Sequence, residues 1–249
     1  QMFQYAIAES LAINKKTKLY FDLSFYEESI HPEITKRAYQ LDLFNISINK
    51  APAWLINLYS PHKVHSKWKR LLYKTIYKIL NITYCNDEGT SLVAADLFEL
   101  KNNNIYLNGF WQNNAPFKFY NRDVSHKFLL EKPTSQKNIE LFEQINKLNS
   151  VAIHVRRGDY VSNVKSFDFH GICEVSYYKN AIEQLNGKLD NPTYFIFSDD
   201  VQWVRDNFNF ISNYTLVSDN AEQNNFEDFR LMRFCKHQII ANSTFSWWA

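Results

Sequence analysis

Short apolar segments alternate with segments of helical periodicity over the second half of the chain, and this alternation restricts the fold more than any other feature. Runs typical of buried strands lie at residues 150–155, 193–197, 214–217 and 238–241, and helical patterns precede or separate them at 137–148, 175–185, 201–208 and 226–235. Strands that alternate with helices of this length form βαβ units, in which the strands lie parallel. We therefore expect an α/β fold with a parallel sheet, entered through a linker at Pro133, Thr134 and Ser135.

The first half of the chain has a less regular pattern. We expect a helix at 2–14 and strands at 18–23 and 104–110. A basic amphipathic helix at 66–80 has apolar side chains at the spacing of a core stripe, with its lysines on a solvated face. The stripe consists of Trp68, Leu71, Leu72, Ile76 and Ile79. These patterns predict an N-terminal α/β domain over residues 1–132 and a second domain over 133–249, with both ends of the natural protein outside this sequence.

Composition restricts the class of protein. The chain has 249 residues, 45% of them hydrophobic, which is enough for the core of a globular protein. Lys and Arg number 28 against 26 Asp and Glu, so the net charge of +2 gives no general indication of nucleic-acid binding. No run of about 18 apolar residues is present to span a membrane. The cysteines Cys85, Cys173 and Cys235 lack metal-type spacing, which favours a reduced, cytosolic compartment.

Polar side chains follow each predicted strand of the second half. Ligands of open parallel sheets bind beyond the carboxyl ends of the strands, so these side chains are candidates for a site. Adjacent Arg156 and Arg157 repel each other unless an anion or a carboxylate lies between them. Two interpretations stay open: the arginines bind a diphosphate, or Asp159 pairs with one of them and fixes the loop. The other sets are Ser198-Asp199-Asp200, Ser218-Asp219-Asn220 and Asn242-Ser243-Thr244.

Each set has a chemical use. Ser243 and Thr244 open a helix, where backbone N–H groups, the helix dipole and two hydroxyls favour a phosphate. A carboxylate at Asp228 or Asp219 could accept both N1–H and the exocyclic amine of guanine, which would select GDP. Asp199 and Asp200 form an alternative metal site, although no D-x-D spacing accompanies them. The common dinucleotide and P-loop glycine motifs do not occur.

Several motifs together resemble the α-1,2-fucosyltransferases, glycosyltransferase family 11. They are HVRRGDY at residues 154–160, FSDD at 197–200 with Trp203, and IIANSTFSWW at 239–248. MFQYA at residues 2–6 resembles the segment after that family's Gly-Asn-Gln loop, and YLNGFWQ at 106–112 resembles its mid-chain motif. The glycine and asparagine expected before Gln1 are absent, which puts one edge of the site in doubt.

The resemblance implies a GT-B-like fold of two Rossmann-like domains, of which the second binds the donor. It also implies inverting, metal-independent transfer of L-fucose from GDP-fucose to the 2-hydroxyl of a terminal galactose in a lipopolysaccharide or oligosaccharide glycan. No cofactor besides the donor substrate and no nucleic-acid partner are expected. A cytoplasmic location is expected, with peripheral association at the inner membrane left open, and the oligomeric state is not indicated.

The resemblance further assigns roles to residues. Arg156 contacts the β-phosphate, His154 and Asp228 lie near guanine, and Ser243 and Thr244 complete the phosphate site. A satisfied histidine inside a strand is the alternative for His154. The predicted donor-binding residues are His154, Arg156, Arg157, Ser198, Asp199, Asp228, Asn242, Ser243, Thr244 and Ser246, and the predicted catalytic residues are Arg156, Asp159 and Asp200.

Removal of the acceptor proton has several candidate bases, which are Asp159, Asp199, Asp200 and Glu9. A carboxylate paired with an arginine makes a poor base, and this counts against Asp159. Two interpretations of Trp111 and Gln112 stay open: they form a platform on which a sugar stacks, or they belong to the hydrophobic core. Two rival functions remain open: a non-catalytic nucleotide-sugar or glycan-binding module, and a protein O-fucosyltransferase or other GDP-sugar transferase.

Overall fold

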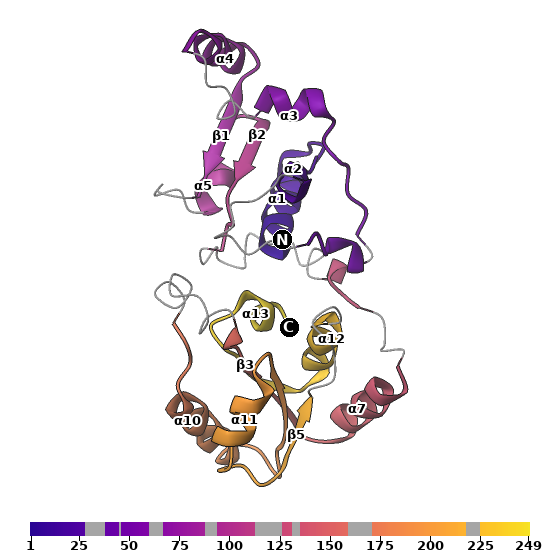
Figure 1. Ribbon diagram of the computed structural model, residues 1–249. Coiled ribbons are helices and arrows are strands. Elements are labelled where there is room, and N and C mark those ends of the chain that lie inside the picture. Colours follow the sequence, from indigo (N-terminus) through magenta and orange to yellow (C-terminus); the bar gives the residue numbers. More distant parts are fainter. Residues whose placement is uncertain are drawn as a thin grey trace. The chain divides into compact units, whose positions relative to one another are not determined.

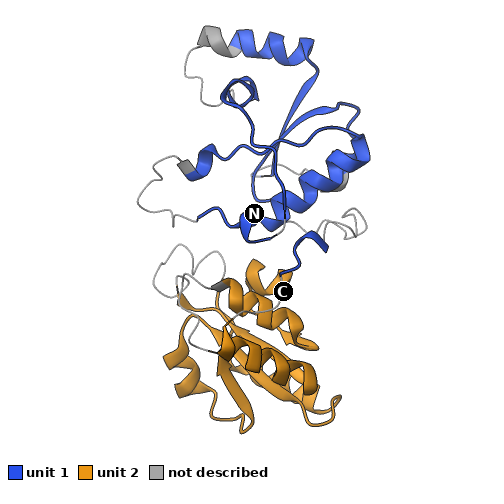
Figure 2. Cartoon of the chain, turned by 90° about the vertical axis from the view of Figure 1, so that its right-hand side faces the viewer, with its two compact units in different colours: residues 1–130 blue, residues 131–249 orange. Residues whose placement is uncertain are grey.

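The computed structural model describes residues 1–27, 38–44, 46–59, 67–87, 94–112, 126–130, 135–158, 171–217 and 225–249. The chain divides into two compact units, residues 1–130 and residues 131–249 (Figure 2). Pro133 and Thr134 of the expected linker lie outside the described residues, whereas Ser135 caps a helix, because its hydroxyl accepts the N–H of Asn138 at 3.3 Å. The expected domain boundary after residue 132, and the roles given to the two domains, stay predictions.

The second unit contains the parallel sheet that the alternating pattern predicts. Its strands are β3 (Ser150–Val155), β4 (Thr193–Ser198), β5 (Tyr214–Val217) and β6 (His237–Ile239), in the spatial order β5-β4-β3-β6. All neighbouring pairs are parallel, with Val155 opposite Ser198 and Ile153 opposite Ile239. The last strand ends at Ile239 rather than at residue 241 as expected. The α/β class with a parallel sheet is therefore confirmed.

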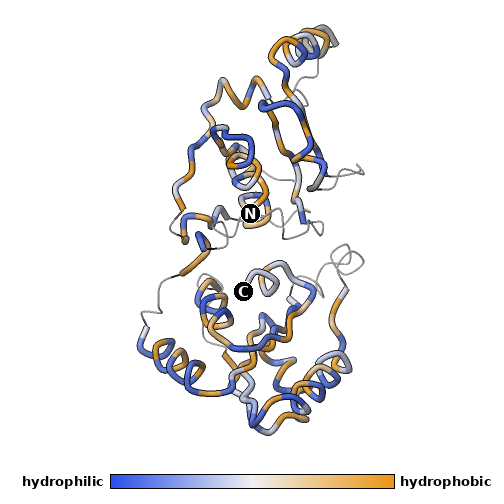
Figure 3. The backbone as a smooth tube through the Cα atoms, turned by 180° about the vertical axis from the view of Figure 1, so that it is seen from behind, coloured by the Kyte–Doolittle hydropathy of each residue, from blue (hydrophilic) through white to orange (hydrophobic). Residues whose placement is uncertain are grey.

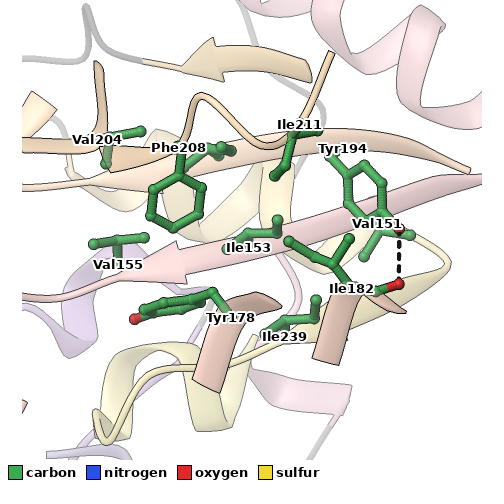
Figure 4. Close-up of a cluster of buried hydrophobic side chains, with 11 residues drawn as sticks. Val151, Ile153, Val155, Tyr178, Ile182, Tyr194, Val204, Phe208, Ile211 and Ile239 are labelled. Carbon is green, nitrogen blue, oxygen red and sulfur yellow. Dashed lines mark hydrogen bonds between the residues drawn. The ribbon is translucent and has the colours of Figure 1, made fainter. Parts of the chain in front are cut away.

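Helices cover both faces of this sheet (Figure 1). They are α7 (Gln136–Lys147), α10 (Val175–Asn186), α11 (Val201–Asn207), α12 (Asn225–Phe234) and α13 (Thr244–Trp248). On one face Val151, Ile153 and Val155 pack with residues of α10 and α11, as Figure 4 shows. On the other face Ala152 packs with residues of α7 and α12. Since β3 is buried on both faces, its sequence is rich in apolar side chains up to the arginines that follow it.

A buried polar cluster joins α7 to α12. Glu227 and Arg230 form an ion pair within α12, and the side-chain amide of Asn138 on α7 donates to Glu227 Oε2 at 3.2 Å. All three residues are buried. Because buried charges are costly unless they are paired and hydrogen-bonded, this arrangement restricts how the two helices can pack.

The first unit consists of helices around a two-stranded parallel sheet, β1 (Ile82–Asn86) and β2 (Asn104–Asn108). Its helices are α1 (Met2–Lys15), α2 (Ser24–Glu27), η1 (Leu41–Leu43), α3 (Ala53–Tyr59), α4 (Lys67–Ile79) and α5 (Ala94–Glu99). Ile7, Leu11, Cys85 and Leu97 form its core together with Trp111. Trp111 is only 2% exposed, so the core interpretation of this residue is correct and the sugar platform is wrong for it.

Two further expectations for the first unit are wrong. The strand at 18–23 is absent, because Phe21 makes only an isolated parallel bridge with Lys50. Most of the apolar stripe of α4 that is described is exposed: Leu71, Leu72 and Ile79 are 60%, 58% and 74% exposed, whereas Ile76 is half-buried. The side chain of Trp68 lies outside the described residues. Tyr73 and Tyr77, whose rings contact each other, are half-buried together with Ile76, so aromatic side chains with a polar hydroxyl take up much of the packed face.

No helix in the described ranges is both long and apolar enough to cross a membrane.

Candidate active site

The two consecutive arginines after β3 each pair with an aspartate after β4. Arg156 Nη1 lies 2.8 Å from Asp199 Oδ2, and Arg157 Nε lies 3.3 Å from Asp200 Oδ2. The parallel register that places Val155 opposite Ser198 brings these two loops together. The repulsion between adjacent guanidiniums is therefore compensated by two carboxylates of the neighbouring strand. The pairing that the sequence suggested for Asp159 cannot be compared, because Asp159 lies outside the described residues.

Asp199 holds the arginine loop by a second contact. The backbone N–H of Arg157 donates to Asp199 Oδ1 at 2.8 Å. A methyl group added at Gly158 would lie 2.5 Å from Asp199 Oδ2, so this position has no room for a side chain while the carboxylate stays in place. The glycine after the two arginines is the part of the sequence that could have indicated this close approach.

Asp200 and Ser198 shape the next turn. Asp200 Oδ1 caps α11 by accepting the N–H of Trp203 at 3.1 Å, and Ser198 Oγ accepts the N–H of Asp200 at 3.0 Å. The guanidinium carbon of Arg157 lies 4.1 Å from the centre of the Trp203 ring, a cation–π contact. Trp203 was not among the predicted site residues, although it belongs to the motif that carries the family resemblance. Asp200 thus has a structural function, and its expected catalytic one stays a prediction.

His154 lies beneath this edge of the sheet and is neutral at physiological pH. It is the penultimate residue of β3. Its side chain is buried and packs against Phe245 of α13, with ring centres 5.5 Å apart. Burial, and secondarily the charge of Arg156, lower the pKa of His154 to about 4. Within the described part of the chain, His154 Nδ1 has no hydrogen-bond partner. A buried ring nitrogen without a partner can accept or donate a hydrogen bond when a ligand supplies the other group.

The contact between His154 and Phe245 places the start of α13 beside the end of β3 (Figure 1). Ser243 caps α13, since its Oγ accepts the N–H of Phe245 at 3.3 Å, while its own hydroxyl hydrogen can still donate. Asn242 and Thr244 on either side are exposed. The buried Ser246 hydroxyl is 3.2 Å from the carbonyl of Ser243 and 3.5 Å from that of Ala241. Ser246 thus hydrogen-bonds to the backbone of this turn, and the donor-binding roles of Ser243, Thr244 and Ser246 stay predictions.

Asp228 is half-buried on α12, directly before Phe229. The ring of Phe229 packs on Phe245 with centres 5.5 Å apart, so α12 lies beside α13 and on the same side of the sheet as His154. Asp219, the alternative carboxylate for guanine, lies outside the described residues. The assignment of Asp228 to guanine stays a prediction.

A separate polar cluster occupies the first unit. Glu9 of α1 forms an ion pair with Lys127, and the Lys127 ammonium also donates to the Tyr5 hydroxyl at 3.3 Å. The hydrogen bond that the Lys127 ammonium donates to Glu9 is the largest of the effects that raise the pKa of Lys127. Glu9 is thus engaged in an ion pair with Lys127, and its role as a candidate base stays a prediction.

The sheet edge carries guanidiniums, whose N–H groups suit an anion, and two carboxylates paired with them. Among the described residues, no group of three or more His, Cys, Asp or Glu could hold a metal ion. Asp199 and Asp200, the alternative metal ligands, both accept from arginines. A guanidinium has five N–H donors, so an arginine that gives one or two to a carboxylate can still bind an anion.

The comparison with protein families shows to which family the chain belongs. The model of Glycosyl transferase family 11 matches residues 52–249. The chain belongs to this family. Residues 154–160, 197–200 and 239–248, whose motifs carried the resemblance, all lie within the matched region. This member of family 11 is therefore a glycosyltransferase, and the expected class of enzyme is confirmed.

Bacterial and mammalian relatives agree with this assignment. The family 11 chain is 31% identical over 256 residues to an α-1,2-colitosyltransferase of Escherichia coli, a match that spans 100% of this chain and 82% of the relative. It is 29% identical over 261 residues to the O-antigen biosynthesis glycosyltransferase WbnK of Escherichia coli, which spans 100% and 85%. A galactoside 2-α-L-fucosyltransferase of Bos taurus is 31% identical over 100 residues, which is 40% of this chain and 27% of the relative. No solved structure gives a significant match, so the GT-B-like arrangement stays a prediction.

Proposed function

We propose that this glycosyltransferase transfers L-fucose from GDP-fucose to the 2-hydroxyl of a terminal galactose in a glycan, with inversion at the anomeric carbon and without a metal ion. Relatives named as galactoside α-(1,2)-fucosyltransferases and as an O-antigen glycosyltransferase support the donor sugar, the linkage and a lipopolysaccharide or oligosaccharide acceptor. The single observation in the structure that carries the proposal is the position of Arg156. It follows the buried strand β3 directly and is held by Asp199 at 2.8 Å.

The chemistry of transfer explains why a held arginine is useful there. When the bond from fucose C1 to the β-phosphate oxygen breaks, negative charge develops on the departing GDP. A cation that is fixed before the reaction stabilises this charge more than it stabilises the bound donor, and so lowers the barrier. Asp199 holds the Arg156 guanidinium through Nη1, and we assign N–H donors of this guanidinium to the β-phosphate. Ser243 and Thr244 at the start of α13 would supply further donors.

Proton removal from the acceptor hydroxyl is a separate requirement. Asp199 and Asp200 both accept from arginines, and Asp200 also caps α11. The candidate bases stay unranked, and Asp159 and Asp200 keep the catalytic role predicted for them.

The test is an assay of GDP release with GDP-fucose and a panel of galactosides, followed by determination of the linkage in the product. We expect a fucose joined to the 2-oxygen of galactose with inverted configuration, and full activity in excess EDTA. Transfer to a protein hydroxyl in place of galactosides would favour the protein O-fucosyltransferase alternative. A strict requirement for Mg²⁺ or Mn²⁺ would overturn the role of Arg156 as the group that neutralises the phosphate.

Colitose is a second candidate for the transferred sugar. The observation that favours it is the match to the α-1,2-colitosyltransferase, which extends over the whole of this chain at 31% identity. The same assay with nucleotide-activated colitose separates the two donors, since the preferred donor has the higher kcat/KM with the same galactoside.

A further inference from the structure

The aliphatic face of α4 is exposed although the helix is held firmly by its other side. The hydroxyl of Tyr73 donates to the carbonyl of Asn57 on α3 at 2.9 Å, and the hydroxyl of Tyr77 is buried. Tyr84 of β1 and Tyr106 of β2 stack on each other with centres 5.5 Å apart, and Tyr106 also stacks on Tyr59 of α3 at 6.1 Å. These tyrosines fix which side of α4 faces the unit.

Helical spacing places an aliphatic stripe beside these tyrosines, with Ile76 next to the packed side and Leu72 and Ile79 turned away from it. Residues three or four positions apart lie on one face of a helix, so Leu72, Ile76 and Ile79 form one stripe. Ile76 is half-buried, whereas Leu72 and Ile79 are among the most exposed aliphatic side chains of the described residues. The neighbouring helix α3 also exposes a large aromatic side chain, Trp54, at 67%. The α3–α4 surface is defined here by the exposed apolar side chains of these two helices, Trp54, Leu71, Leu72 and Ile79.

The charge of α4 has one sign only. Its sequence, KWKRLLYKTIYKI, contains lysines and an arginine and no Asp or Glu. Lys74 and Lys78 are exposed, and no ion pair engages either of them in the described part of the chain. The whole chain has a net charge of only +2, so this concentration of positive charge is local. Figure 3 shows hydrophobic and hydrophilic residues interleaved along this helix.

We propose that the α3–α4 surface binds a bilayer of anionic lipids, with α4 lying in the plane of the headgroups. An interfacial helix has Leu, Trp or Phe on one face, Lys and Arg on the other, and low net hydrophobicity, which describes α4. Its aliphatic face would enter the boundary of the acyl chains, and the long stems of Lys74 and Lys78 would carry their charges to the phosphates. At about 1.5 Å per residue the helix is far too short to cross the bilayer.

Anionic lipid fits this surface better than an apolar groove of a protein would. A protein partner for the stripe would have to place acidic side chains along the full length of α4, whereas a membrane surface presents negative charge wherever the helix settles. The inference does not rest on the proposed donor or acceptor, because lipid binding requires neither.

The test is flotation of the protein with vesicles of phosphatidylcholine alone or of an equal mixture of phosphatidylcholine and phosphatidylglycerol. We expect binding to the mixture, little binding to phosphatidylcholine, and weaker binding at high salt, since salt screens the charges. Replacing Lys74→Gln and Lys78→Gln together should weaken binding by roughly 30-fold, at about fivefold for each charge at the surface. Leu72→Gln with Ile79→Gln should weaken it by about tenfold or more, because two buried aliphatic side chains are lost.

The matched control combines Leu148→Gln and Lys188→Gln, two partly or fully exposed positions of the second unit. This control should bind vesicles as the unchanged protein does, and all variants should keep their turnover on a soluble galactoside. Equal vesicle binding by the α4 variants and the unchanged protein would overturn the proposal. Absence of vesicle binding would also overturn it, and so would self-association of the chain that only the Leu72 and Ile79 changes abolish. A failed fucosyl transfer assay would leave the vesicle result unaffected, so the two proposals can fail separately.

Discussion

The carboxyl ends of the two parallel sheets carry different chemistry. In the second unit, β3 and β4 end in arginines and aspartates that pair across the strands at 2.8 and 3.3 Å. In the first unit, Asn108 Nδ2 donates to Asn86 Oδ1 at 3.1 Å, Gln4 Nε2 donates to the carbonyl of Gly109 at 2.8 Å, and Asp87 after β1 accepts the N–H of Trp111. Fixed cations suit the phosphates of a nucleotide, whereas amides suit the hydroxyls of a neutral sugar. The difference agrees with the proposal that the second unit binds the donor, and the acceptor role of the first unit stays a prediction.

The largest effect is expected from removal of Arg156 at the end of β3. Arg156→Ala should lower kcat with GDP-fucose and a β-galactoside by roughly 10² to 10³, the usual cost of losing a donor to the transition state. Arg156→Lys should recover only part of this loss, because lysine keeps the charge but not the planar fork. Arg205→Ala on the exposed side of α11 is the matched control. A variant with lowered thermal stability and intact kcat would show that Arg156 is structural.

The pH dependence of the free energy of unfolding tests how strongly the folded protein disfavours protonation of His154. Unfolded histidine titrates near 6.5 and folded His154 at about 4, so the folded state binds fewer protons between these values. Stability is therefore fully present above pH 6.5 and falls as the pH drops toward 4, by about 3 kcal/mol in all. Urea unfolding at a series of pH values measures this loss. His154→Leu removes the titrating group and should flatten the profile, and an unchanged profile would mean that His154 is not buried as described.

Nucleotide selection sharpens the assignment of the donor to the second unit. Asp228→Asn replaces one acceptor oxygen by a donor, which would face the guanine N–H groups. GDP binding should weaken by roughly 10- to 100-fold, the usual range for a hydrogen bond to a charged group. Calorimetry with GDP measures the change, with Asp206→Asn on α11 as the control. Unchanged affinity would transfer the recognition of guanine to another residue, such as Asp219.

The smallest expected effects come from the two glycines, one at each edge. Gly109 has a φ of +123°, and a methyl group there would overlap the carboxylate of Asp87, which accepts the N–H of Trp111. Gly109→Ala should therefore lower the stability of the fold by about 1–3 kcal/mol. Gly158 has an ordinary φ, and a methyl group there would displace only the Asp199 carboxylate.

Gly158→Ala should accordingly leave stability nearly unchanged and lower kcat by about tenfold, through loss of the Arg156 orientation. Urea unfolding and turnover of both variants measure the contrast. Loss of stability without loss of turnover in Gly158→Ala would mean that the pair of Arg156 and Asp199 holds the loop and does not serve catalysis.

Prediction from sequence succeeded where strands are buried on both faces. The segment from Ser150 to Val155 is rich in apolar side chains because helices cover both sides of β3, and this composition predicted a buried strand. The partners of these arginines were less predictable. Asp199 and Asp200 lie more than forty residues away in the chain, and only the parallel register of β3 and β4 brings them near.

The first unit was harder to predict because its side chains are amphipathic. In β1 only Ile82 and Cys85 are buried, so the segment lacks both the alternation of a half-exposed strand and the apolar run of a buried one. Helices α3 and α5 are short and gave no clear periodicity. In α4 the aliphatic spacing was recognised, but tyrosines occupy the packed face, and hydropathy alone ranks tyrosine below leucine for burial.

The strand order β5-β4-β3-β6 has a consequence for synthesis of the chain. On the ribosome β3 can pair with β4 as soon as Ser198 has emerged, but its other neighbour, β6, begins only at His237. Until then one edge of β3, a strand buried on both faces in the folded protein, presents its N–H and C=O groups to any other extended chain, a geometry that promotes misassembly. The nascent protein therefore passes through a stage in which β3 is paired along one edge, and co-expression of a chaperone should matter most in that interval.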